Sequence, residues 1–302
     1  MTRQNIILVG PCVGELYWEF FRFAPYVFNE QKKLNNIPLV VLTRKDRYDI
    51  YGSRCIEFKD LIINNENNTR FGECFRMIGL NENDYYAICH AFFHSMKEKY
   101  NIVKHFYPPY KKGDYVNKDY YPLQNRLFEY KVRKENRKLV KKFLSDVEKP
   151  IVILAPRYRK NFKRNWPHWQ ELYDKLSNTK WHDEIEFIIC GKKNEYVPDK
   201  YNRFKDINNI ELSDNASLFG VLLELMKHAK LTIGSQSAIP NISLLYKVPV
   251  VEWGNQKKLH TITYNIYKTP VKFFESKNFD ISLTEVFNQI VIELTNILLK
   301  RN

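Results

Sequence analysis

The sequence predicts an α/β protein made of two successive domains, each built on a parallel β-sheet. The length of 302 residues suits about two domains. Short apolar segments alternate with helical patterns twice along the chain, first within Asn5–Thr43 and again from Ile151 onward. This alternation is typical of β-α-β units, in which the two strands run parallel.

The composition excludes wholesale disorder and points to an anionic partner. Hydrophobic residues make up 44% of the chain and aromatic residues 15%. The formal net charge is +14. A balance this basic favours a phosphate-bearing small molecule, nucleic acid or a membrane surface as partner. A solvated basic surface with no specific partner explains the charge equally well.

Cysteine usage and hydropathy indicate the compartment. The five cysteines show no zinc-binding spacing, and the histidines, among them His90 and His94, form no metal motif. No apolar stretch approaches the length of a transmembrane helix, and no signal-peptide pattern opens the sequence. We therefore expect a cytoplasmic protein without a transmembrane segment, a resident cofactor or a metal.

The first domain opens with a β-α-β pattern, which is the clearest signal in the first half of the chain. Asn5–Gly10 is an apolar run that predicts a buried strand, and Ile37–Thr43 predicts a second one. Between them, Glu15–Gln31 has helical spacing, with a break expected near Ala24 because Pro25 follows.

The remainder of the first half has weaker signals. We expect a helix over Arg70–Leu80, a strand over Tyr85–Cys89 and a long loop over Tyr107–Leu123. A charged helix over Arg126–Val147 then leads to Lys149-Pro150, which predicts a domain boundary.

The second half repeats the pattern more cleanly. Strands are expected at 151–155, 186–190, 231–233 and 248–253, and helices at 166–177, 217–228, 235–246 and 283–300. The predicted organisation is an N-terminal domain over 1–148, a C-terminal domain over 149–280 and a terminal helix over 281–302.

The loop after the first strand is a candidate site. Ligands bind beyond the carboxyl ends of strands in an open parallel sheet. Gly14 permits a close backbone approach, and the Glu15 carboxylate could take a proton from a substrate hydroxyl. Glu15 could instead only complement the dipole of the following helix.

Two loops of the second half are candidate anion sites. Five cations lie within Arg157–Arg164, just after a strand, and Arg157, Arg159 and Arg164 could bind phosphate through forked hydrogen bonds. Ser235–Ser237 lies between a strand and a helix start, where backbone N–H groups and hydroxyls could hold an anion. The alternatives are an exposed charge run and ordinary helix capping.

Several blocks of the second half resemble the nucleotide-sugar-binding domain of GT-B glycosyltransferases, in particular the heptosyltransferase-like glycosyltransferase family 9. The resemblance covers about 150–254 and is carried in order by PRYRK, RNWPHWQELYDKL, FIICGKKNE with Gly191, ELSDNASLFGVLLELMKHA, and LTIGSQSAIPNISLLYKVPVVEWG. Near the N-terminus, VGELYWEFFRFAP looks like the loop that carries the family's catalytic Asp, here Glu15. The family's Asp-Ser/Thr-Gly-x-x-His signature is replaced by Ser235-Gln236-Ser237-Ala238-Ile239-Pro240, without the His.

The resemblance implies two Rossmann-like α/β/α domains facing across a cleft, with the C-terminal helix crossing back to the first domain. It implies an inverting, metal-independent transfer of a sugar from a nucleotide diphosphate sugar. Glu15 is then the base, and the donor is bound by Gly14, Arg157, Arg159, Arg164, Gly191, Ser235, Gln236 and Ser237. A glycan, another anionic molecule or nucleic acid is expected as acceptor, and the charge also suits peripheral membrane contact.

Other functions remain open from the sequence. An epimerase or hydrolase of sugar nucleotides would use the same fold without an acceptor. A nucleic-acid-binding or nucleic-acid-modifying protein would account for the charge, and it would bind nucleic acid with a steep dependence on salt.

Overall fold

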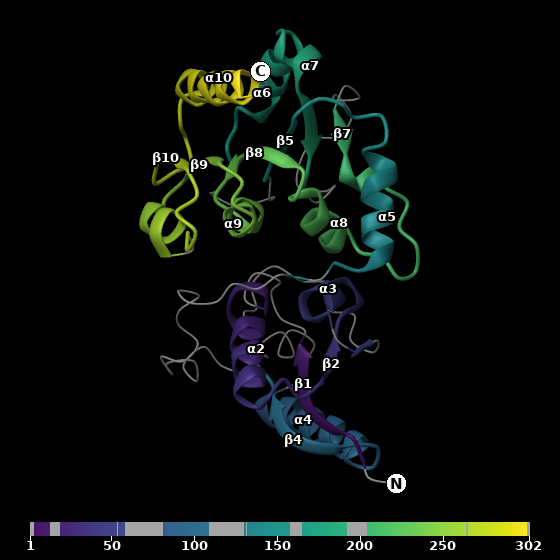
Figure 1. Ribbon diagram of the computed structural model, residues 1–302. Coiled ribbons are helices and arrows are strands. Elements are labelled where there is room, and N and C mark those ends of the chain that lie inside the picture. Colours follow the sequence, from purple (N-terminus) through teal and green to yellow (C-terminus); the bar gives the residue numbers. More distant parts are fainter. Residues whose placement is uncertain are drawn as a thin grey trace. The chain divides into compact units, whose positions relative to one another are not determined.

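The computed structural model describes residues 3–12, 19–52, 54–57, 81–108, 130, 132–157, 165–191, 204–263 and 265–300 (Figure 1). The chain divides into two compact units, Met1–Arg133 and Lys134–Asn302. The predicted boundary lies at 148/149. The helix expected over 126–147 is shorter in the structure, Lys134–Phe143, and lies in unit 2.

Unit 1 contains a four-stranded parallel sheet with the order β3-β2-β1-β4. Its strands are β1 (Asn5–Cys12), β2 (Leu39–Thr43), β3 (Arg54–Glu57) and β4 (Asn101–Phe106). The strands expected at Asn5–Gly10 and Ile37–Thr43 are confirmed as β1 and β2. Residues 6–12 of β1 and all of β2 are buried, as expected for central strands of a parallel sheet.

The helical elements of unit 1 are η1 (Glu19–Phe23, a π-helix), α2 (Ala24–Lys33), η2 (Lys45–Arg47, 3₁₀), α3 (Tyr48–Tyr51) and α4 (Glu82–Lys97). At the kink or break expected near Ala24 the helix changes type without a gap: the π-helix η1 ends at Phe23, and α2 begins at Ala24 with Pro25 in its first turn. Proline fits this position since the first-turn N–H groups have no helical acceptor.

The strand expected over Tyr85–Cys89 is wrong, because these residues lie within α4. Asn81 and Asp84 form a capping box that starts the helix. Tyr85, Cys89 and Phe92 then follow at helical spacing and are buried. The helix expected at 70–80 and residues 109–123 of the expected loop lie outside the described residues.

Unit 2 contains a six-stranded parallel sheet with the order β10-β9-β8-β5-β6-β7. Its strands are β5 (Ile151–Ala155), β6 (Glu186–Ile189), β7 (Lys205–Asp206), β8 (Ala229–Ser235), β9 (Val250–Gly254) and β10 (Val271–Glu275). The chain builds outward from β5 through β6 to β7, then returns to the other side of β5 with β8. This is the doubly wound order, and the winding direction reverses between β5 and β8.

Helices cover both faces of this sheet (Figure 1). One side carries α6 (Trp169–Ser177), α7 (Trp181–Glu184) and α10 (Leu283–Leu299), and the other carries α5 (Lys134–Phe143), α8 (Leu218–Leu225) and α9 (Ala238–Leu245). Two short segments, η8 (Ile207–Asn209) and η9 (Leu259–Thr263), complete the unit. All strands and helices predicted from 149 onward are present, whereas β7, β10, α7, η8 and η9 were not expected.

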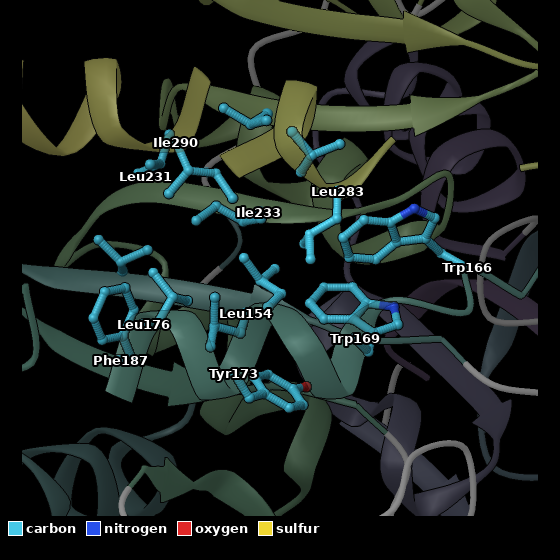
Figure 2. Close-up of a cluster of buried hydrophobic side chains, with 14 of the residues drawn as sticks. Leu154, Trp166, Trp169, Tyr173, Leu176, Phe187, Leu231, Ile233, Leu283 and Ile290 are labelled. Atoms are coloured by element: carbon cyan, nitrogen blue, oxygen red, sulfur yellow. The ribbon is translucent and has the colours of Figure 1, made fainter. Parts of the chain in front are cut away.

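Figure 2 shows the core of unit 2, where α6 and α10 meet the sheet. Leu154 and Ile233 from the strands contact Leu176 of α6 and Ile290 of α10 within one buried cluster. The buried stripe of α10 is therefore part of the core of its own unit. The crossing of this helix to the first domain, which the resemblance implied, is not confirmed.

Two isoleucines of α10 test how this helix is held. Ile290 is fully buried in the core of unit 2, whereas Ile292 is 53% exposed. We expect Ile290→Ala to lower the free energy of unfolding by about 2–5 kcal/mol, because it removes buried apolar contacts and leaves a cavity. The control Ile292→Ala should change it by less than about 0.5 kcal/mol. Equal effects in denaturant titrations would contradict this packing.

Candidate functional site

The candidate donor site lies where the winding of the unit 2 sheet reverses. Arg157 follows the end of β5, and Ser235–Ser237 spans the end of β8 and the start of α9. The Arg157 Nη1 donates to the backbone carbonyl of Gln236 at 2.6 Å. The structure thus brings together two loops that are about 80 residues apart in sequence. This is the position at which doubly wound sheets bind ligands.

Gln236 links the loops after β8 and β9. Its Oε1 accepts the backbone N–H groups of Asn255 and Gln256 at 3.0 and 3.2 Å, and its Nε2 donates to Gln256 Oε1 at 2.5 Å. Its backbone N–H donates to the Trp253 carbonyl at 2.8 Å. These bonds give Gln236, which is 4% exposed, a scaffolding role. Direct contact between its side chain and a donor stays a prediction.

The start of α9 offers backbone donors at a half-buried surface. Ser237, Ala238 and Ile239 are all partly exposed, and the first-turn N–H groups of a helix have no helical acceptor. Within the described part of the chain, the Ser237 hydroxyl makes no capping bond. The buried Ser235 Oγ likewise has no hydrogen-bond partner among the described residues. The predicted alternative of simple N-capping by Ser237 is therefore not seen.

An acidic side chain that the sequence analysis missed lies beneath this helix start. Glu252 of β9 is fully buried, with Oε1 2.9 Å from Nδ1 of the buried His260. Burial raises the pKa of the Glu252 carboxyl, while His260 and the Ser237 amide oppose that shift. A raised pKa favours the neutral acid, which does not repel a phosphate group.

Of the other predicted site residues, the structure describes only Gly191. Gly191 follows β6 at the same edge of the sheet, one strand beyond β5, and its carbonyl accepts from Asn208 Nδ2 at 2.8 Å. Gly14, Glu15, Arg159 and Arg164 lie outside the described residues. Their predicted roles therefore stay predictions.

Unit 1 holds a buried polar cluster at the carboxyl ends of β1 and β2. The Thr43 hydroxyl lies 3.0 Å from the Cys12 carbonyl and 2.9 Å from Glu19 Oε1. A hydroxyl has one proton to donate, and the carbonyl can only accept it. Both contacts become hydrogen bonds when Glu19 is protonated and donates to Thr43.

Electrostatics favour the same protonation state. Burial raises the pKa of Glu19 to about 7, against the opposing effects of Arg47, Thr43 and Tyr51. Glu19 is 4% exposed and begins η1, four residues after the predicted base Glu15. Glu19 is thus a buried carboxyl that is mostly protonated below pH 7, next to the loop expected to carry the chemistry.

The residues that sequence analysis missed share one feature, namely a charged side chain inside an apolar segment. Glu252 interrupts the predicted strand over 248–253, and Glu19 stands between Trp18 and Phe20. A carboxylate in such a position requires a partner, which is the signal that could have identified both. His260 carried no comparable signal, because its pairing with Glu252 depends on the turn after β9.

No group of three or more His, Cys, Asp or Glu side chains in the described ranges could hold a metal ion. No described helix is both long and apolar enough to cross a membrane.

The fold of the chain is that of solved glycosyltransferases. A glycosyltransferase family 9 protein from Veillonella parvula superposes with a TM-score of 0.58 and 11% identity, covering 98% of each chain. The ADP-heptose lps heptosyltransferase II of E. coli also superposes with a TM-score of 0.58, at 12% identity, and the match covers 97% of this chain and 99% of that one. Heptosyltransferase WaaC of E. coli, with ADP-2-deoxy-2-fluoro heptose, superposes with a TM-score of 0.50 and 11% identity. The match covers 96% of this chain and 99% of that one.

The resemblance expected from the sequence is thus confirmed at the level of the fold, and it extends over nearly the whole chain rather than over 150–254 alone. No protein-family model matches the sequence, and no curated protein is significantly similar to it.

The Glu19 carboxyl predicts how stability depends on pH. The pKa of Glu19 is raised from 4.5, its ordinary value, to about 7 in the folded state. At a pH between these two values the folded state therefore holds a proton that the unfolded state has lost. The free energy of unfolding should therefore fall by about 3 kcal/mol from this group as pH rises from about 4.5 to about 7. Glu19→Gln should remove most of this fall and raise the Tm at pH 8.

The control for this experiment is Glu98→Gln, at an exposed position of the same unit. It should leave the pH profile of the Tm unchanged. A Glu19→Gln profile parallel to that of the wild type between pH 5 and 8 would show that Glu19 is not a buried acid.

Proposed function

We propose that the protein is an inverting, metal-independent glycosyltransferase that moves a sugar from a nucleotide diphosphate sugar to a hydroxyl of a glycan or another anionic acceptor. The proposal rests chiefly on the pairing of Arg157 with the start of α9 at the point where the unit 2 sheet reverses its winding. The similarity to solved heptosyltransferases, one of them with an ADP-sugar analogue, supports this substrate class.

The donor diphosphate would lie against Arg157 and the first turn of α9. Negative charge develops on the leaving diphosphate during transfer, and a guanidinium together with helix N–H groups would stabilise it. Arg159 and Arg164 would add charge from the same loop. Such an arrangement could neutralise the leaving group in place of a metal ion.

Glu15 would act on the acceptor. Its carboxylate would take the proton of the acceptor hydroxyl as the oxygen bonds to the anomeric carbon and the bond to the diphosphate breaks. Attack opposite the leaving group in one step inverts the configuration at that carbon. Below pH 7, where Glu19 is mostly protonated, Glu15 would be the ionised carboxylate of this segment.

Thermal stability with nucleotides tests the donor site. In the absence of metal, one nucleotide diphosphate or its sugar at 100 times its Kd should stabilise the protein by about 2.7 kcal/mol. We expect Arg157→Ala to abolish this stabilisation, because Arg157 supplies a cation to the diphosphate. Lys268→Ala, which removes an exposed cation elsewhere in unit 2, should preserve it.

If no nucleotide stabilises the wild type while it binds DNA or RNA in a salt-dependent manner, the chain is a nucleic-acid-binding protein instead. If a nucleotide sugar binds and is consumed without any acceptor, the activity is that of an epimerase or hydrolase.

Replacement of the predicted base tests the mechanism. Glu15→Gln should lower turnover by about 10²–10⁴-fold, since general-base catalysis contributes about that much. Stabilisation by the donor should not change, because Glu15 would act on the acceptor. The control Glu30→Gln, on α2, should retain turnover. Full turnover in Glu15→Gln would refute the assignment of the base.

A further inference from the structure

Helix α5 carries a basic face that the proposed chemistry does not use. Its exposed positions are Lys134, Arg137, Lys138, Lys141 and Lys142, called here the α5 face. With 3.6 residues per turn these side chains fall within about 140° of arc, and with a rise of 1.5 Å per residue they extend over about 12 Å. The α5 face is therefore a compact array of five positive charges.

The opposite side of α5 is fixed to unit 2, beside α8 (Figure 1). Asn136 Oδ1 accepts the backbone N–H of Ser217, the N-cap of α8, at 3.0 Å, and Val140 is buried. At the other end, Lys205 Nζ donates to the Phe143 carbonyl at 3.1 Å and to Asp146 at 2.6 Å. These anchors hold the cations of the α5 face at a defined spacing.

The cations of the α5 face repel one another. Lys134 has cations three and four residues later, and Lys141 has cations three and four residues earlier. Like charges at these spacings destabilise a helix. Lys33 and Lys227 instead each pair at 2.6 Å with a glutamate three residues earlier.

Helix α5 itself contains one acidic residue, Glu135. Glu135 is half-buried on the flank of the helix, and Asp146 already pairs with Lys205. An external surface of negative charge would relieve the repulsion.

We propose that the α5 face docks on the anionic headgroups of a lipid bilayer. Four of its five cations are lysines, whose compact, hydrated ammonium groups act as point charges rather than as bidentate forks. No aromatic side chain lies among the exposed positions of α5, so this face lacks the stacking platforms that hold single-stranded nucleic acid. Clusters of four to eight cations are of the size that binds anionic bilayers.

A vesicle-binding experiment tests this docking independently of any transferase activity. The full-length protein is sedimented with phosphatidylcholine vesicles that contain phosphatidylglycerol, and with pure phosphatidylcholine vesicles. We expect binding to the anionic vesicles only, and weaker binding at higher salt. Replacing all five cations of the α5 face by Gln should weaken binding by at least about 100-fold.

The matched control replaces five other exposed lysines of unit 2 by Gln, namely Lys230, Lys268, Lys272, Lys277 and Lys300. It lowers the net charge of +14 by the same amount and should retain most of the binding. The α5 variant should melt at or above the Tm of the wild type, because the repulsion has been removed. The double variant K138Q/K141Q should lose part of the binding and provides a smaller perturbation.

Three results would overturn the proposal. The first is a wild-type protein that does not bind anionic vesicles. The second is an equal loss of binding in the α5 variant and in the matched control, which would assign binding to the total charge. The third is an α5-dependent binding of DNA or RNA without binding to vesicles, which would assign the face to nucleic acid.

Discussion

The hydrogen bonds of Gln236 organise the candidate donor site. This residue joins the loop after β8 to the loop after β9, and its carbonyl receives Arg157 from the end of β5. Space for its side chain exists because residue 254 is glycine, where a Cβ would overlap the Gln236 side chain. Three strand ends and the first turn of α9 are thereby held in one arrangement. A preorganised site of this kind needs no rearrangement of these groups when an anion binds.

Buried acids lie at the carboxyl ends of the strands in both units. Burial raises the pKa of Glu19 in unit 1 and of Glu252 in unit 2. In each case a polar neighbour lies within 3 Å of one carboxyl oxygen, Thr43 for Glu19 at 2.9 Å and His260 for Glu252 at 2.9 Å. A raised pKa favours the protonated form of each carboxyl, in which the cost of a buried charge and the repulsion of a phosphate are avoided. The expected ionised carboxylate, Glu15, would then be distinct from both.

The similarity to solved glycosyltransferases at 11–12% identity is a similarity of fold. A doubly wound sheet requires apolar strands with amphipathic helices on both faces, and many different sequences meet this requirement. Charge is less constrained by the fold. The net charge of +14 follows from the sequence, whereas the structure shows that five of the cations lie on one exposed face of α5.

The sequence by itself determined the α/β class, the strands of the second half and the loops after β5 and β8, because these depend on local apolar runs and their endings. The helix over Tyr85–Cys89 follows from a local signal, the capping box of Asn81 and Asp84, whereas the tertiary structure decided that the buried stripe of α10 belongs to the core of unit 2. It also decided that Gln236 is a scaffold and that Glu252 meets His260. The contacts of α10, Gln236 and Glu252 join separate strands, helices and loops, and local periodicity does not encode such contacts.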